Sequence, residues 1–295
     1  MEPSKQENEK ALRHLGARQC PSAPNETEGV AARFSAAAPT YHPLASIQRV
    51  TAEKLMSLLA SATEPPPLRA PERILEIGCG TGVLTAILAD TFSSALIDAV
   101  DVSSAMAAKA RGYLVRNKMI NWIIADAVRL PEDRKYPLII SNCALHWIAP
   151  IETIILKLGD MLAPKGRLAF AVMLDGTLGE LNACRQKIAP LKPPRVTMPE
   201  RDEIKKALTG AGLAIRRIKT ETIRQEYPSA EKMLKQLHDQ GLTGGNIPQR
   251  HLLLNRSEIS RLIADYAENY KSANGVYASY RVFYGVAAKE KHKAG

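Results

Sequence analysis

The sequence predicts an α/β fold: a mostly parallel sheet with helices on both faces. Three observations lead to this prediction. Short apolar runs alternate with amphipathic stretches over residues 73–173, as in parallel sheets whose strands are joined by helices. A glycine-rich turn follows the first apolar run, and Asp101 closes the second. The chain has 295 residues, 45% of them apolar, which is enough for one large domain with a full core.

The first part of the chain is predicted to contain a tail, a cap and the core. Residues 1–29 are polar, contain proline and lack periodicity, so we expect a disordered tail. A helical cap is expected over 30–60. The core elements then alternate in the order strand 73–77, helix 82–91, strand 95–101, helix 103–116, strand 120–125, strand 136–142, helix 150–162 and strand 166–173.

After Met173 the alternation stops. Four prolines in 175–200 predict an irregular lid, and 229–272 is expected to be a second, largely helical lid segment. The remaining predicted elements are a helix over 201–209, a strand over 213–223 and a late antiparallel strand over 277–288. Residues 30–290 are therefore predicted to form one domain with a seven-stranded sheet, followed by a tail at 291–295.

The glycine-rich turn carries the main functional signal. Residues 74–82 read Ile-Leu-Glu-Ile-Gly-Cys-Gly-Thr-Gly. Gly78, Gly80 and Gly82 have no Cβ atom, so the backbone of the turn can come close to a ligand. Asp101 ends the next strand, where a carboxylate can accept hydrogen bonds from both hydroxyls of a ribose. The sequence therefore predicts a nucleoside-binding turn.

Two cofactor classes use such a turn. A nicotinamide dinucleotide site needs G-x-G-x-x-G, and here Val83 stands in place of its last glycine. Glu76 suits S-adenosylmethionine (SAM), which has a cationic amino group and no phosphate. A tight turn without a ligand would explain a lone glycine loop, but not the loop, Glu76 and Asp101 together. The sequence thus looks like a Rossmann-like class I methyltransferase that uses SAM and no metal.

Further candidate residues follow the other strands, at the sheet edge where open α/β sheets bind ligands. Asp126 and Ala127 are expected at the adenine, where the carboxylate accepts a hydrogen bond from the amino group. Met106 is expected either to pack on the adenine or to belong to the core. Predicted cofactor contacts also include Val102 and Asn142. His146 and Trp147, after the fourth strand, are expected to face the substrate, although a single histidine is often structural.

Composition limits the other classes of function. There is no run of 18 apolar residues and no apolar signal core in the first 30, so we expect a cytoplasmic protein without a membrane span. Four separated cysteines without a C-x-x-C pair argue against zinc and disulfides. Residues 151–295 carry 24 Lys and Arg against 15 Asp and Glu, which indicates an acidic partner or simply a solvated basic surface.

Segments outside the cofactor motif resemble one family, the malonyl-[acyl-carrier protein] O-methyltransferases of biotin synthesis. One is Arg-Phe-Ser-Ala-Ala-Ala-Pro-Thr-Tyr at 33–41, and another is Ser-Asn-Cys-Ala-Leu-His-Trp at 141–147. The resemblance covers about residues 30–290. Its other parts are residues 47–48, 176–181, 237–241, 254–262 and 279–286. His146 departs from the glutamine more usual in the family, and His238 and Arg281 also depart from its pattern.

The resemblance implies a reaction and a set of roles. SAM would methylate the free carboxylate of a malonyl thioester carried by acyl carrier protein or coenzyme A. Gln48 would join the cofactor contacts. Tyr41 would hold one carboxylate oxygen, unless it only pins the cap to the sheet, and Arg281 would assist as a cation. On the lid, we expect an acidic carrier to meet the basic residues Arg185, Lys187, Lys192 and Arg195.

Three other functions compete. One is methylation of a different small carboxylic acid, which needs a closed cationic pocket rather than a basic rim. RNA methylation is disfavoured, because the sequence has no Asn/Asp-Pro-Pro-Tyr/Phe motif and no appended RNA-binding module. A non-catalytic protein that keeps the fold to bind a partner is disfavoured by the intact glycines, Glu76 and Asp101. We expect a monomer that binds neither nucleic acid nor membrane.

Overall fold

The structure, a computed structural model, describes residues 26–62, 71–117, 119–192, 197–242 and 253–290. It contains one sheet with the strand order β3-β2-β1-β4-β5-β8-β6. The first five strands pair in parallel, and β8 is antiparallel to β5 and β6. The strands are β1 (Arg73–Ile77), β2 (Leu96–Asp101), β3 (Ile120–Ile124), β4 (Tyr136–Asn142), β5 (Leu162–Met173), β6 (Leu213–Tyr227), β7 (Lys271–Ser272) and β8 (Gly275–Lys289).

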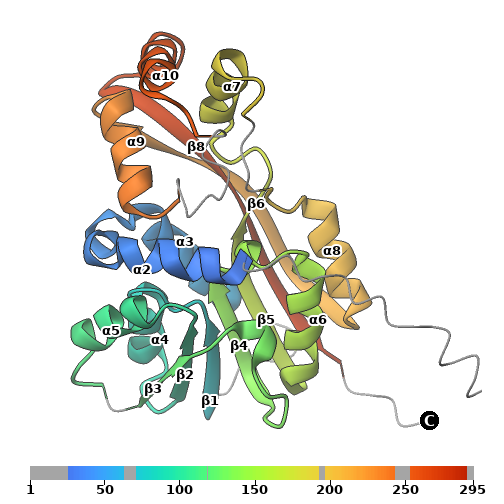
Figure 1. The fold of residues 1–295 in the computed structure, drawn as a ribbon. Helices are drawn as coiled ribbons and strands as arrows, with labels where there is room; N and C mark the ends of the chain where they lie inside the picture. The colour runs from blue at the N-terminus through green and yellow to red at the C-terminus, as the bar shows by residue number, and fades with distance from the viewer. Residues whose placement is uncertain (1–25, 63–70, 118, 193–196, 243–252, 291–295) are drawn as a thin grey trace, which may run out of the picture.

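The mostly parallel α/β fold predicted from the sequence is confirmed (Figure 1). The short strand β7 pairs with β8 and adds an eighth strand to the seven that were predicted. The α-helices are α2 (Glu26–Leu44), α3 (Ser46–Ser61), α4 (Val83–Thr91), α5 (Ser104–Tyr113), α6 (Ile151–Met161), α7 (Gly179–Ile188), α8 (Arg201–Gly210), α9 (Ala230–Asp239) and α10 (Arg256–Asn269); the short 3-10 helices are η1 (Ala127–Arg129) and η2 (Leu145–Trp147).

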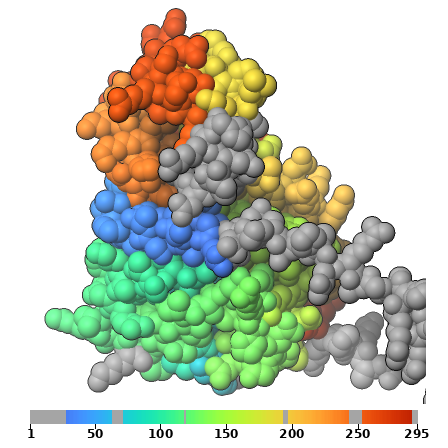
Figure 2. Space-filling model, in the orientation of Figure 1, coloured from blue at the N-terminus to red at the C-terminus, as the bar shows by residue number. Residues whose placement is uncertain are grey.

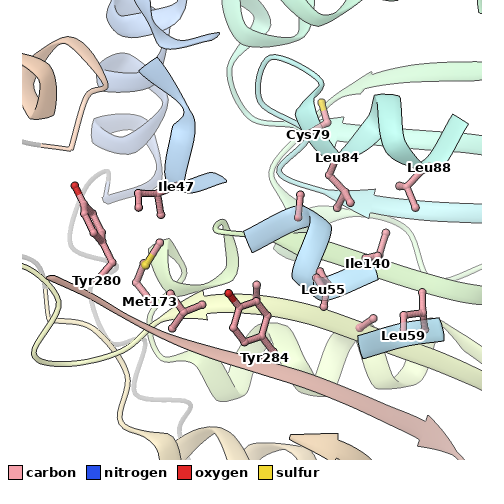
Figure 3. Packing of buried hydrophobic residues seen from close by; sticks show 14 of the residues in the cluster. Ile47, Leu55, Leu59, Cys79, Leu84, Leu88, Ile140, Met173, Tyr280 and Tyr284 are labelled. Atoms are coloured by element: carbon pink, nitrogen blue, oxygen red, sulfur yellow. The ribbon is translucent and has the colours of Figure 1, made fainter. Parts of the chain in front are cut away.

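Successive side chains of each core strand serve opposite faces of the sheet. Ile74 packs with Leu55 of α3 and Leu88 of α4 on one face, whereas Leu75 packs with Ile154 of α6 on the other. Figure 3 shows Leu55 and Leu88 on the first of these faces. Core strands that are buried on both faces have continuous apolar sequences, which is why the sequence predicted their positions well. This packing fixes the carboxyl ends of β1, β2 and β4 at a common edge.

A lid stands on the long strands β6 and β8, which extend beyond the parallel strands (Figure 1). Its helices α9 and α10 bury Met233 and Leu262 in the same apolar cluster as the core. The Tyr227 and Tyr280 hydroxyls lie 2.7 Å apart inside it. Residues 175–200 were predicted to be irregular, but they contain α7, since the prolines fall after that helix.

Helix α2 lies as a band between the core and the lid (Figure 2). Ser35 Oγ lies 2.8 Å from Ser103 Oγ in the core, and Thr40 Oγ1 donates to Asp239 O in the lid over 2.8 Å. The helix begins at Glu26, so residues 26–29 are helical rather than part of a disordered tail, and residues 1–25 lie outside the described part. Among the described helices, none is long and apolar enough to cross a membrane.

Candidate active site

A cavity of about 770 Å³, part of it open to solvent, lies under α2 at the carboxyl ends of β1, β2 and β4. It brings together most of the site residues predicted from the sequence. Those lining it are Tyr41, Gly78, Gly80, Asp101, Val102, Met106, Asp126, Ala127, Asn142 and Trp147.

The glycine turn is held against β2 by backbone hydrogen bonds. The amides of Gly78 and Cys79 donate to Val100 O over 2.8 and 3.0 Å. Gly78 and Gly80 adopt φ of +72° and +54°, in the left-handed region that favours glycine. A Cβ atom on Gly80 would meet nothing within 4 Å, so a ligand can approach that backbone closely.

Asp101 orders the turn as well as facing the cavity. Its Oδ2 accepts from Gly80 N and its Oδ1 from Ser103 N, both over 2.8 Å. Burial raises the pKa of Asp101, and the two amide hydrogen bonds oppose that shift. Each carboxylate oxygen keeps a further lone pair. The carboxylate can therefore accept two more hydrogen bonds from a ligand.

Two buried acceptors near the turn have no donor. Glu76 Oε2 and Gln48 Oε1 are inaccessible to solvent and accept no hydrogen bond. Burial raises the pKa of Glu76 to about 8. Neither residue is among those that line the cavity. Unpaired buried acceptors cost free energy, and an ammonium group, which has three donors and a positive charge, would relieve that cost.

The other end of the cavity suits a flat aromatic ligand. Met106 is buried in a cluster with Ala37 and Ala38 of α2, as predicted for a core residue, and it also lines the cavity. Asp126 Oδ1 caps η1 by accepting from Val128 N over 3.1 Å. The second carboxylate oxygen of Asp126 has no partner among the described residues. It is thus available to an amino group.

Asn142 and Tyr41 join the cap to the sheet. Asn142 Nδ2 donates to Gln48 O over 2.9 Å, which ties the end of β4 to α3. Burial raises the pKa of Tyr41, so its hydroxyl stays protonated and can donate a hydrogen bond. Phe34 meets the Tyr41 and Trp147 rings edge to face, at centroid distances of 6.1 and 5.4 Å. These three rings make an aromatic wall.

His146 does not line the cavity. It is buried, and its Nδ1 accepts from the Met173 amide over 3.4 Å. Burial lowers the pKa of His146 to about 3, so the imidazole is neutral at physiological pH. The structure therefore gives it a structural place behind Trp147 instead of the predicted substrate contact.

Replacing His146 by glutamine should flatten the pH dependence of stability. The pKa of His146 is about 3 in the folded chain, against about 6.5 in an unfolded chain. Its neutral state stabilises the fold fully above about pH 6.5, and this contribution falls as the pH drops from about 6.5 towards 3. His146→Gln keeps an acceptor but cannot titrate. Chemical denaturation between pH 4 and 8 would measure the difference; parallel curves would contradict this assignment.

Two further predicted residues also lie away from the cavity. Arg281 lines a separate depression, where its Nη1 donates to Asp175 O over 2.9 Å, so the structure does not bring it to the site. Gly82 has a φ of +86°, and a Cβ there would come within 3.1 Å of Ala110 Cβ. Gly82 therefore allows α4 and α5 to pack closely and is not among the lining residues.

The sequence analysis missed several lining residues: Val30, Phe34, Ile77, Val100, Ala125, Cys143, Ala144 and Ile148. The seven-residue spacing of Phe34 and Tyr41 places both on one face of α2 and could have indicated Phe34. Cys143 has a φ of +55°, which no sequence pattern predicts.

The lid cations Arg185, Lys187 and Lys192 form hydrogen bonds or ion pairs with other residues of the lid. Lys187 pairs with Asp265, and Lys192 Nζ lies 2.6 Å from Glu258 Oε2. Both of these carboxylates are on α10. Arg185 Nε donates to Lys192 O over 2.6 Å. These contacts fasten α7 to α10, so they do not leave the free basic rim that was expected; Arg195 lies outside the described residues. Among the described residues, no cluster of His, Cys, Asp or Glu could hold a metal ion.

Comparisons with known proteins agree with this site. A methyltransferase-domain family model matches residues 74–166. The chain is 31% identical to the malonyl-[acyl-carrier protein] O-methyltransferase of Geobacter sulfurreducens over 264 residues, which cover 87% of this chain and 96% of the relative. It is 30% identical to the enzyme of that name from Priestia megaterium, over 84% of this chain and 92% of the relative.

Solved structures support the fold. A putative methyltransferase from Bacillus halodurans superposes with a TM-score of 0.57 at 14% identity, over 82% of this chain and 100% of the other. The magnesium protoporphyrin IX methyltransferase of Synechocystis, solved with bound SAH, gives a TM-score of 0.51 at 18% identity, over 83% of each chain. At these identities the likeness concerns the fold alone.

Proposed function

The chain belongs to the malonyl-[acyl-carrier protein] O-methyltransferase family, and we propose that it methylates the free carboxylate of a malonyl thioester at the start of biotin synthesis, with SAM as the methyl donor. The observation that carries the proposal is the cavity, which Asp101, Asp126 and Asn142 line with polar groups and Met106 and Ala127 with apolar ones. We assign the transfer of the methyl group to the space beside the aromatic wall, which Phe34 and Tyr41 of α2 and Trp147 of η2 form.

The residues present fit SAM. Asp101 has lone pairs left for the ribose hydroxyls, and Asp126 has a free oxygen for the adenine amino group. Met106 and Ala127 line the space for the adenine ring. The orphaned acceptors of Glu76 and Gln48 suit the ammonium group. When bound, SAM supplies an electrophilic methyl group on a sulfonium.

The protein needs no general base for this reaction. A malonyl carboxylate is ionised at neutral pH and is itself the nucleophile. The neutral, recessed His146 is consistent with that chemistry. What the chain must do is orient a carboxylate oxygen and exclude water. We assign orientation to the protonated Tyr41 hydroxyl and water exclusion to Phe34 and Trp147.

Tyr41→Phe should lower kcat/KM for a malonyl thioester about tenfold. One positioning hydrogen bond is worth about 1.4 kcal/mol, and this free energy corresponds to a tenfold change in rate. The affinity for SAM should stay within about twofold, because the hydroxyl is assigned to the substrate. Steady-state kinetics and SAM titration calorimetry measure the two quantities. Tyr113→Phe, on the exposed end of α5, is the matched control. Unchanged kcat/KM would leave Tyr41 with a packing role only.

The proposed function has a direct test. The protein is incubated with SAM and, separately, malonyl-acyl carrier protein, malonyl-coenzyme A, malonate and aconitate. Mass spectrometry should show the gain of one methylene on the acyl group of a malonyl thioester. Methylation of a free acid alone would support the small-acid alternative, and SAM titration without heat would support a non-catalytic role. The carrier itself, the monomeric state and the cytoplasmic location remain predictions.

A further inference from the structure

Arg33, on α2, is a partly buried cation for which no hydrogen bond or ion pair of the side chain is found in the described part of the chain. Its guanidinium carbon lies 5.1 Å from the centroid of the Trp147 ring, in a cation–π contact. Its Nε is inaccessible to solvent and donates no hydrogen bond. Burial lowers the pKa of Arg33, with no offsetting carboxylate. A desolvated guanidinium without an acceptor costs free energy, which a nearby negative charge reduces.

Arg33 lies where the cavity, the cap and the lid meet. Val30, one turn earlier on α2, and Phe34, the next residue, both line the cavity, as does Trp147. On the other side, Gly241 of the lid packs so closely that a Cβ there would come within 3.1 Å of Arg33 O. The guanidinium is thus stacked on a ring of the active-site wall, on the part of α2 that faces the lid.

Several other cations near the cap and the lid have polar partners. Arg49 donates to His42 O, Lys54 pairs with Glu221, and Arg281 donates to Asp175 O. The described cations of α7 contact α10 or their own loop. Arg33 differs from these because only an aromatic face contacts its charge.

We propose that Arg33 is the specificity residue that selects acyl groups ending in a carboxylate, an inference that rests on the proposed malonyl methylation. Tyr41 lies eight residues further along α2, which is about 12 Å of helix, and both side chains lean towards the helix N-terminus. A carboxylate held by Tyr41 therefore feels the charge of Arg33 without pairing with it directly. The reacting oxygen keeps its lone pairs, and the uncharged ester product is no longer attracted.

The experiment compares wild type, Arg33→Gln and Arg33→Lys, using malonyl-N-acetylcysteamine as substrate and acetyl-N-acetylcysteamine as competitor. Arg33→Gln should raise KM for the malonyl thioester about three- to tenfold, as expected for one charge acting over about 12 Å. The inhibition constant of the acetyl thioester and kcat should stay within about twofold. Arg33→Lys should restore most of the KM. Arg111→Gln, an exposed cation on α5 outside the cavity, is the control.

SAM titration calorimetry on each variant verifies that the cofactor site is intact. An unchanged malonyl KM in Arg33→Gln, or an equal loss for both thioesters, would overturn the proposal and leave Arg33 as a packing partner of Trp147. Wild-type turnover tests the proposed function independently. If wild type methylates no malonyl thioester, the function fails. Charge selection is then tested by calorimetry of malonyl against acetyl thioester binding to the SAH-loaded protein, where equal affinities in wild type would reject it.

Discussion

Asp101→Ala should weaken SAM binding by at least about a hundredfold. The carboxylate is expected to accept two hydrogen bonds from the ribose, and each bond to a charged acceptor is worth about 1.5–3 kcal/mol. With about 1.4 kcal/mol per tenfold change in Kd, the loss spans at least two decades. Isothermal titration calorimetry measures it. The effect exceeds that of most single contacts, because this carboxylate also accepts from the amides of Gly80 and Ser103.

Asp101 is expected to bind the ribose and also orders the glycine turn, so the two effects of its removal need separate controls. Removing the carboxylate leaves the Gly80 amide without its acceptor, so the turn loosens even without ligand. Thermal unfolding of the variant without SAM measures the stability lost when the turn loosens. Asp90→Ala removes an exposed carboxylate from α4 and should change neither quantity. If Asp101→Ala binds SAM within threefold of wild type, the ribose does not lie at Asp101, and the cofactor assignment is wrong.

Local sequence predicted the part of the site that local geometry determines. A strand, a glycine turn and the carboxylate that ends the next strand lie within about thirty residues, and β1 pairs directly with β2. Their proximity follows from chain connectivity and the parallel sheet. The same holds for Asp126, two residues after β3, and for Asn142, the last residue of β4, because β3 pairs with β2 and β4 with β1. These predictions needed no knowledge of side-chain packing.

The predicted residues that lie away from the cavity have positions that depend on contacts between distant segments. His146 follows β4 at the right edge, but the short helix η2 turns it into the core, where Met173 of β5 donates to it. Arg281 lies on β8, and its guanidinium turns to the carbonyl of Asp175. Residues 151–295 do carry the excess of basic residues that was counted, but the pairing of Lys187 with Asp265 and of Lys192 with Glu258 depends on how α7 and the segment after it meet α10. Residue type and order along the chain do not determine such orientations.

The three glycines of the turn also show what the sequence alone does not determine. Each position needs glycine for a different structural reason. Gly80 lines open space, and a Cβ there would meet no protein atom within 4 Å. A Cβ on Gly78 would lie 2.2 Å from Ala144 Cβ, in the segment after β4. Gly82 is required by α5. The motif therefore combines ligand approach, packing of one strand end on another, and packing of two helices.

Gly78→Ala should lower the free energy of unfolding by about 2–5 kcal/mol. A non-glycine residue at a φ of +72° costs about 1–2 kcal/mol, and forcing a methyl group into a packed site costs about 1–3 kcal/mol more. Denaturant unfolding measures the loss. Gly80→Ala incurs only the backbone cost in stability, but its methyl group stands at the cavity and should weaken SAM binding about tenfold or more.

A double-mutant cycle separates the clash from the strain. The next nearest atom to the Gly78 Cβ position is Ala144 Cα at 3.6 Å, so Ala144→Gly removes the offending methyl group and leaves an ordinary contact. The double variant Gly78→Ala/Ala144→Gly should lose about 1–3 kcal/mol less unfolding free energy than the sum of the losses in the two single variants. The backbone cost should remain. Strict additivity would mean that the two segments do not meet as the structure has them. The close approach of the glycine turn to the end of β4 would then no longer explain why position 78 needs glycine.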